Sequence, residues 1–581
     1  MRLVLAQVAL ALLVLAWAVH PGWALVAAPL AAPLAMPVRL RRPSRPPTGA
    51  MLLEVVRPGA VMTSVDIDGV DVGVVEDADG LAAVIRVGDL TDLLGDAPPP
   101  VPPLSTLLPA PAADLPQARI QLLVGATAAA DPGAGATPSA VSYRQLTDGR
   151  LPARRQALLS VRIRRAGGFQ HEDLERSLVA AVRRACRQLD RAGLPARPLS
   201  PPSALAALDE AAGHHPERPV RSTRRGLEVG GSVQAVFRLR RWPRDGPLAD
   251  RLLTLPCSAV TVALTVAPTD PGGEDACRAE VTIRLAAPTP AALDQAAAAL
   301  HRLTVSLSAE TVRLGGSPLD ALDPLDALAA TLPLGGGAPP GAAALAGLLT
   351  GRDDLTLDGS AAARVSAAAL AALTPSTGGD GLMLGVNRHG TPVVVRPFRA
   401  EPTRAVLIGG LGCAALLTLR ALAVGAHVTV HSTRPDAWSP LLRGLRGEPI
   451  SLLPAGQPAD LPPPTAAAPQ LLVIDTGPAD GGGHASPPSP ESAWRATLVV
   501  RDDLTAADTD QLTRADLVLL QPLTPAEAAI ATDALGLTES ASWLTRIAPE
   551  MLGIVVSRRT VRWAHLSPTP VELQLTGGPA R

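Results

Sequence analysis

The chain has 581 residues, of which 52 are basic and 53 acidic, and 47% of its residues are apolar. This length allows roughly three or four domains with real hydrophobic cores. The near balance of charge argues against a nucleic-acid-binding protein, whose domains usually carry a basic excess. Every basic residue is arginine, and the lack of lysine excludes a P-loop lysine, a Schiff base and a catalytic lysine.

The N-terminal segment contains two uncharged apolar runs, Leu3–Val19 and Ala24–Val38, separated by His20–Trp23. The first run is near the lower length limit for a membrane-spanning helix. The second carries three prolines, which membrane helices tolerate when neighbours satisfy the freed carbonyls. We therefore predict a transmembrane hairpin of two helices over residues 1–45. A signal peptide cleaved after Ala18 is the alternative.

Arginines flank this predicted hairpin on both sides. Positive residues beside membrane segments stay in the cytoplasm. We therefore expect a plasma-membrane protein with two spans and the lipid bilayer as a partner, with both termini and the body from residue 46 onwards in the cytoplasm. The flanking arginines are Arg2, Arg39, Arg41, Arg42 and Arg45.

Residues 46–97 predict a small β-meander. Apolar and polar residues alternate between two Asp-Gly pairs, which are strong hairpin signals. The acidic turns lack the ligand spacing of an EF-hand, so no metal site is expected. A proline-rich linker over residues 98–114 follows. The predicted strands are Thr63–Ile67, Val70–Val75 and Leu81–Val87.

Residues 115–340 alternate strands with helices. We predict an α+β domain with helices on one face of an antiparallel sheet. Thr289 is predicted to cap a helix that begins at Pro290 and runs to Leu303. The predicted strands are Arg119–Val124, Ala157–Ile163, Val233–Arg240, Ala259–Val266 and Arg278–Ala287.

The segment from His171 to Pro195 predicts an amphipathic helix that ends near Gly193. Its opposite face carries arginines, which are either solvated or part of an interaction surface. We take Arg183, Arg187 and Trp242 as candidate partner-contact residues. The residues predicted to share the apolar face are Leu174, Leu178, Ala181, Val182, Ala185 and Leu189.

Residues 341–581 predict a β-hairpin over Leu382–Phe398, followed by a Rossmann-like, doubly wound α/β domain. Its short apolar strands are typical of a parallel sheet covered on both faces. A capping box at Thr524 with Pro525 at the first helical position predicts a helix that Gly536 closes. The predicted strands are Ala405–Ile408, His427–His431, Leu471–Ile474, Thr497–Val500 and Leu517–Leu520.

A glycine turn follows the first of these strands. Gly410, Gly412 and Ala415 match the dinucleotide-binding pattern G-x-G-x-x-A in the right context. No acidic residue follows the second strand to hold a ribose, although Arg434 there suits a 2′-phosphate. Asp475 ends a strand as a magnesium-binding aspartate would, yet its partner lysine cannot exist. We interpret the turn as structural, with no cofactor; nucleotide binding is the alternative.

No catalytic residues are predicted, and we expect no enzymatic activity. The ten histidines lack partners at a spacing that implies chemistry. The four cysteines, Cys186, Cys257, Cys277 and Cys413, form neither a C-x-x-C pair nor a zinc-binding spacing. They are expected to be buried, reduced thiols.

Several short motifs along nearly the whole chain resemble the EccE family of actinobacterial type VII (ESX) secretion systems. They follow the apolar N-terminal segment in a fixed order. They are "VDVGVVEDADGLAAVIRV", "SYRQL" (Ser142–Leu146), "GLPARPL" (Gly193–Leu199), "FRLRRWP" (Phe237–Pro243), "TLPLGGG" (Thr331–Gly337) and "EPTRAVLIGGL" (Glu401–Leu411).

The resemblance implies a non-enzymatic subunit of an inner-membrane complex that exports folded WXG100-type dimers. Members of this family stand beside EccB, EccC and EccD, and EccC supplies the ATPase. The family contributes no catalytic residues, and no nucleic-acid partner is implied. The rival hypothesis is a membrane-tethered enzyme that uses the Gly410–Gly412 turn to bind a nucleotide or a nucleotide sugar.

Overall fold

The computed structural model describes residues 49–581 with interruptions, and this part of the chain lies within one compact unit. The predicted hairpin over residues 1–45 lies outside the described residues. The interruptions are residues 90, 96–99, 110–114, 130–136, 167, 216, 224–225, 244–247, 269–275, 316–323, 337–362, 367–368, 371–373, 455–456, 458–462, 478–490, 538–540, 558–559 and 580.

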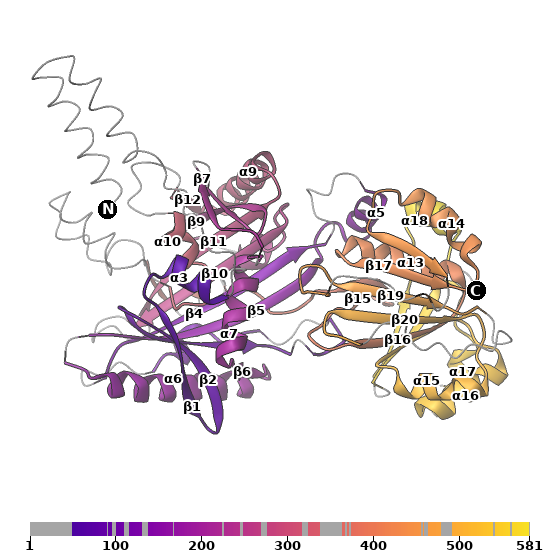
Figure 1. Ribbon diagram of the computed structural model, residues 1–581, viewed down its shortest axis with the longest axis horizontal. Coiled ribbons are helices and arrows are strands. Elements are labelled where there is room, and N and C mark those ends of the chain that lie inside the picture. The colour runs from indigo at the N-terminus through magenta and orange to yellow at the C-terminus, as the bar shows by residue number, and fades with distance from the viewer. Residues whose placement is uncertain are drawn as a thin grey trace, which may run out of the picture. The chain divides into compact units, whose positions relative to one another are not determined.

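The predicted fold class needs correction, because it gave the molecule a transmembrane hairpin. The fold is α/β and contains two large sheets (Figure 1). Within the described residues, no helix combines the length and the apolar character that crossing a membrane requires. Helix α6 (His171–Arg191) is long but charged along one face, and the apolar α13 (Leu411–Ala423) has 13 residues, fewer than the roughly 20 needed.

The first sheet is antiparallel and has 13 described strands. Its main path runs β1-β2-β3-β5-β4-β10-β11-β9-β8-β7, with β6 beside β3, β12 beside β9 and β13 beside β11. The strands are β1 (Val61–Ile67), β2 (Val70–Asp77), β3 (Gly80–Val87), β4 (Ala118–Ala128), β5 (Pro152–Arg164), β6 (Ala196–Pro198), β7 (Arg221–Thr223), β8 (Gly226–Val229), β9 (Ser232–Arg241), β10 (Ala259–Pro268), β11 (Ala276–Ala287), β12 (Glu310–Leu314) and β13 (Ala363–Ser366).

Helices cover both faces of this sheet, whereas the sequence predicted helices on one face. In β3, Leu81, Ala83 and Ile85 pack in one core with α6 and α9, while Ala82 and Val84 join cores on the opposite face. That face carries three helices that are short or weakly patterned. They are α3 (Gly49–Val56), α7 (Pro201–Ala212) and α10 (Pro324–Ala329); the first face carries α4 (Leu104–Leu107), α6, α8 (Leu248–Leu252) and α9 (Pro290–Ser306).

The order of elements in this first sheet repeats. Strands β1 to β6 with α4, α6 and α7 follow one sequence of elements, and β7 to β12 with α8, α9 and α10 follow the same sequence again. From its two edges the sheet reads β1-β2-β3-β5-β4 and β7-β8-β9-β11-β10, and β4 pairs antiparallel with β10 in the middle. The two halves are therefore related by an approximate twofold axis through this central pair.

The second sheet follows the order β15-β14-β23-β22-β21-β16-β20-β19-β17-β18. The pairs from β21 to β18 are parallel, and the remaining pairs are antiparallel. Its strands are β14 (Leu382–Val386), β15 (Pro392–Val395), β16 (Thr403–Ile408), β17 (His427–Ser432), β18 (Ile450–Pro454), β19 (Gln470–Asp475), β20 (Arg495–Arg501), β21 (Leu517–Leu520), β22 (Met551–Val556) and β23 (Thr560–His565).

The parallel strands are covered on both faces. Leu407 packs with α13, and Ile408 packs with α16 on the other side. The strand order differs from the Rossmann order 3-2-1-4-5-6, because the first parallel strand, β16, lies between β20 and β21, so the term Rossmann-like was too specific. The helices of this part are α13, α14 (Pro435–Gly444), α15 (Thr509–Arg514), α16 (Pro525–Leu535), α17 (Ala541–Leu544) and α18 (Pro570–Thr576).

Helix α5 (Pro138–Thr147) links the first half of the chain to the second sheet. It packs against α13 and α18, and Figure 1 shows it as an indigo helix among orange and yellow elements. The hydroxyl of Tyr143 donates to Gly381 O (3.2 Å) and accepts from Met383 N (2.9 Å). Ser142 Oγ lies 2.6 Å from Thr569 Oγ1. The "SYRQL" motif is thus a docking segment.

We expect the change Tyr143→Phe to lower the free energy of unfolding by about 1–3 kcal/mol, because it leaves the buried Met383 N–H without its acceptor. The ring still fills its site, where Tyr143 is 1% exposed. Chemical denaturation followed by tryptophan fluorescence measures the difference. Arg144→Ala on the same helix is the control, and equal stability of Tyr143→Phe and the wild type would disprove this role.

Candidate functional site at the carboxyl edge of the parallel sheet

The candidate site lies where β16, β19, β20 and β21 end. In open α/β sheets, ligands bind in the crevice beyond the carboxyl ends of the parallel strands. Strand β16 ends at Ile408, and α13 begins at Leu411 after the turn Gly409-Gly410. The sequence motif G-x-G-x-x-A therefore lies at the position where a nucleotide-binding turn would lie.

The N–H groups of this turn are already hydrogen-bonded within the chain. Gly410 N donates to Gln521 Oε1 (2.7 Å), and Gly409 N donates to Arg501 O (2.8 Å). Gln521 is fully buried, and its Nε2 donates to Pro579 O. A phosphate would need these backbone donors, so the turn offers it fewer groups than the motif suggests.

The segment that follows α18 covers the first turn of α13. A Cβ placed on Gly412 would lie 2.0 Å from Gly578 O, so only glycine permits this close approach of two backbones. Ala415 is 5% exposed and belongs to the core beneath the helix. The three residues of the predicted motif therefore lie together, but they contact protein atoms.

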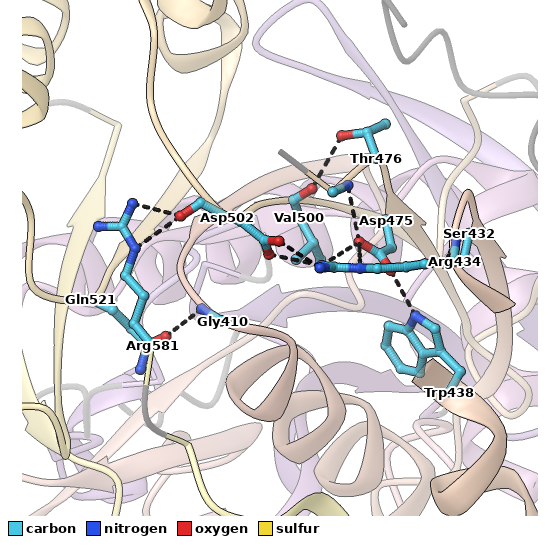
Figure 2. Close-up of polar contacts among 11 residues, drawn as sticks. Gly410, Ser432, Arg434, Trp438, Asp475, Thr476, Val500, Asp502, Gln521 and Arg581 are labelled. Atoms are coloured by element: carbon cyan, nitrogen blue, oxygen red, sulfur yellow. Dashed lines mark hydrogen bonds and ion pairs between the residues drawn. The ribbon is translucent and has the colours of Figure 1, made fainter. Parts of the chain in front are cut away.

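Arg581, in the same segment after α18, lies near the ends of β20 and β21. Its guanidinium donates to Asp502 O (2.9 and 2.6 Å; Figure 2). It also donates to Pro522 O (2.6 Å) and forms an ion pair with Glu527. Hydrogen bonds to the carboxylate, from Arg581 among others, outweigh burial and keep the pKa of Glu527 below its usual range.

Asp475, at the end of β19, has a side chain without solvent exposure. It accepts hydrogen bonds from Ser432 Oγ (2.8 Å), Trp438 Nε1 (2.8 Å) and the Arg434 guanidinium (2.9 to 3.2 Å). Burial alone would raise the pKa of Asp475, but the hydrogen bonds from these three side chains outweigh it and hold the pKa below its ordinary value. The Asp475 carboxylate therefore binds other side chains of the protein.

Arg434 joins this carboxylate to a second one. Its guanidinium also bonds both oxygens of Asp502, directly after β20, with Nη2 at 2.7 Å from Oδ1 (Figure 2). Hydrogen bonds to Asp502 and Asp475 raise the pKa of Arg434 above its ordinary value, although burial acts in the opposite direction. This planar fork is bidentate to both carboxylates and joins the carboxyl ends of β19 and β20.

The sequence identified Arg434 and Asp475 separately and missed their pairing, as well as Asp502, Gln521 and Trp438. A usable signal was present, because Asp502 and Gln521 directly follow β20 and β21, and the carboxyl ends of parallel strands share one edge. Among the described residues, no group of three or more His, Cys, Asp or Glu side chains could hold a metal ion.

The predicted partner-contact residues lie on the first sheet, away from this crevice. Arg183 on α6 pairs with Asp68 (2.7 Å), and Arg187 on the same helix is exposed. Helix α6 packs over β3 and β5, while Trp242 follows β9, which is separated from β5 in the sheet by β4, β10 and β11. Trp242 is half-buried against the core of that sheet. The fold therefore brings Arg183 and Arg187 together on one helix and leaves Trp242 apart.

The four cysteines are free, and three of them are buried. Burial raises the pKa of the Cys413 thiol to about 12 and, as the main cause, that of Cys186 to about 11. Neither thiol therefore forms a nucleophilic thiolate near neutral pH.

Comparison with known proteins gives one family match. The model described as "Putative type VII ESX secretion system translocon, EccE" matches residues 152–239, from the start of β5 into β9. No curated protein matches the chain. The match confirms the resemblance on which the family prediction was based, and it covers the segment that contains α6.

Among solved structures, the chain is similar to a viral genome packaging NTPase from Sulfolobus turreted icosahedral virus 2. The complex with AMPPCP shows 10% identity and a TM-score of 0.21 over 30% of this chain and 100% of that chain. The complex with sulfate shows 12% identity and a TM-score of 0.21 over 29% and 98%. This likeness is too weak to assign a fold or an activity. Residues 152–239 are thus similar to the EccE family of type VII ESX secretion translocon components.

Proposed function

We propose that this protein is a non-enzymatic structural subunit of a membrane-associated type VII secretion complex, and that it stabilises the assembly through contacts with other subunits. The observation that carries the proposal is the crevice at the carboxyl edge of the parallel sheet, whose polar groups bind one another. Asp475 is held by Arg434, and the Gly410 N–H is held by Gln521.

A binding site for a nucleotide needs free donors at the glycine turn and space above it. Here Gly578 lies against Gly412, and the Arg581 side chain lies across the ends of β20 and β21. These contacts support a domain that is used for its shape and its surface. They favour the structural role over the rival hypothesis of a nucleotide-dependent enzyme.

The exposed face of α6 is the surface we propose for these contacts. Arg183 is 41% exposed and its partner Asp68 is 67% exposed. Ion pairs as exposed as this one contribute about 0–1 kcal/mol, so Arg183 can exchange its partner at little cost. Arg187 lies one helical turn further along the same face. An acidic surface on EccB-, EccC- or EccD-like subunits is the partner that this face fits.

The double change Arg183→Glu/Arg187→Glu tests this surface. We expect the other secretion subunits to be recovered with the tagged variant at a yield at least tenfold lower, roughly the effect of 1.4 kcal/mol in binding. Arg443→Glu/Arg514→Glu, which changes two exposed arginines of the second half, is the matched control. Recovery of the whole complex at wild-type yield with the α6 variant would contradict the proposed surface.

A further inference from the structure

A small cavity lies in the second half of the first sheet. It is lined by β8, β9 and β11 and by the start of α10, with Gly226, Arg284, Arg313 and Gly315 on its walls. The space available to the centre of a water-sized sphere is about 10 Å³, which is close to the minimum that holds one water molecule. Any occupant must therefore be about the size of a water molecule or a single ion.

Arg284 is a buried cation on the wall of this cavity and is 4% exposed. Its Nη2 donates to Ala211 O and to Thr261 Oγ1 (2.9 Å), both neutral acceptors, and its Nη1 has no hydrogen-bond partner among the residues that the structure describes. Burial lowers the pKa of Arg284 to about 10, and no carboxylate among the described residues offsets this burial. A buried, unpaired charge is strongly unfavourable.

A second guanidinium lines the same cavity. The Cζ of Arg313 lies 6.0 Å from the centre of the Phe237 ring. The Nη2 of Arg313 would lie 3.6 Å from a Cβ placed on Gly226, so it reaches the same wall of the cavity. Two guanidinium groups therefore line the cavity.

The repeat within the sheet provides an internal comparison. Arg284 is the ninth residue of β11 and pairs with Val236, the fifth residue of β9. In the other half, the ninth residue of β5 is Ser160, which pairs with Val84, the fifth residue of β3. The space beneath α7 in that half is filled by an apolar cluster that includes Val84. At this position of the repeat, the first half therefore has a serine and the second half a buried arginine.

We propose that this cavity binds a monatomic anion, chloride under ordinary conditions, with Arg284 Nη1 as its main donor. The cavity is too small for phosphate, and an uncharged water would leave the guanidinium without a counter-ion. The anion neutralises Arg284 where β9, β11 and the start of α10 meet, and so stabilises the packing of α10 on the sheet.

Thermal unfolding of the full-length protein tests this site. We compare sodium chloride with sodium gluconate at equal ionic strength, so that general screening is matched. The melting temperature of the wild type is expected to rise with chloride concentration until the site is saturated. Arg284→Met is expected to lose this dependence, while Arg238→Met, which breaks a charge pair with Glu280 on the same sheet, is expected to keep it.

A crystal of the wild-type protein grown or soaked in bromide gives a second readout, which does not require any variant to fold. The expected result is one anomalous peak within hydrogen-bonding distance of Arg284 Nη1. Identical melting in chloride and gluconate together with no bromide peak there would overturn the proposal.

Discussion

Replacing Glu572 by glutamine is expected to lower the free energy of unfolding by about 3–5 kcal/mol, because it leaves a buried arginine without its counter-charge. Arg420 and Glu572 are 0% and 1% exposed and form a bidentate pair, with both N–O distances at 2.9 Å. Arg420 also donates to the carbonyls of Leu384 (2.8 Å) and Leu566 (2.8 Å). The pair therefore joins α13 to α18 and to β14.

Chemical denaturation with hydrogen exchange at α18 measures this effect. Glu550→Gln, at a carboxylate that is 67% exposed, is the control and is expected to change little. The double change Arg420→Met/Glu572→Leu is expected to recover much of the loss, because it removes both buried charges. If Glu572→Gln unfolds at the wild-type midpoint, the pair does not hold these elements together.

Arg434→Met is expected to destabilise the protein by about 2–3 kcal/mol at neutral pH, because it leaves the buried Asp475 carboxylate without its cation. This expected loss of stability is smaller than the loss for a fully buried ion pair, because the Arg434 side chain is 29% exposed and solvent weakens the interaction. Arg443→Met in α14, the helix that directly follows Arg434, is the matched control.

The direction of the pKa shift of Asp475 determines how the effect of Arg434→Met changes with pH. The folded-state pKa of Asp475 lies below its ordinary value, so its contribution to stability is complete above the unfolded pKa of about 3.9 and is lost as pH falls through the folded pKa. We therefore expect the stability difference between wild type and Arg434→Met to be largest at pH 7 and to narrow below roughly pH 4. A difference that is the same at pH 7, 5 and 3.5 would contradict the assignment to Asp475.

Local features of the fold were predictable because short-range physics determines them. The apolar face of α6 was predicted with the six residues that are buried. The capping box of α16 at Thr524 and its closure at Gly536 were also confirmed, and so was the cap of α9 by Thr289. Hydrophobic periodicity and capping need only neighbouring residues, so the sequence alone is enough.

Arrangements that depend on distant segments were not predictable in the same way. Whether helices cover one face of a sheet or two depends on where α3, α7 and α10 return to it, and their patterns are short or weak. The strand order around β16 depends on crossover connections, which leave no local mark in the sequence. The Rossmann-like assignment failed for this reason.

The candidate site contains features that were predictable from the sequence and contacts that were not. The glycine motif at Gly410 and Gly412 was visible in the sequence, but its contacts with Gln521 and Gly578 join residues far apart in the chain. Arg434 and Asp475 were each noticed as possible ligand groups, and each supplies the partner of the other. The glycine motif indicates that the turn could bind a phosphate. The residues that pack against the turn determine whether its N–H groups are free to do so.

The central claim is that the chain's own groups close this crevice, so that the protein acts by contact. Calorimetric melting of the purified full-length protein with ATP, NAD, NADP or UDP-glucose at millimolar concentration tests it most directly. A ligand at 100 times its Kd adds ~2.7 kcal/mol to the free energy of unfolding. We predict no change in melting temperature with any of the four; a saturable increase with one of them would contradict the account.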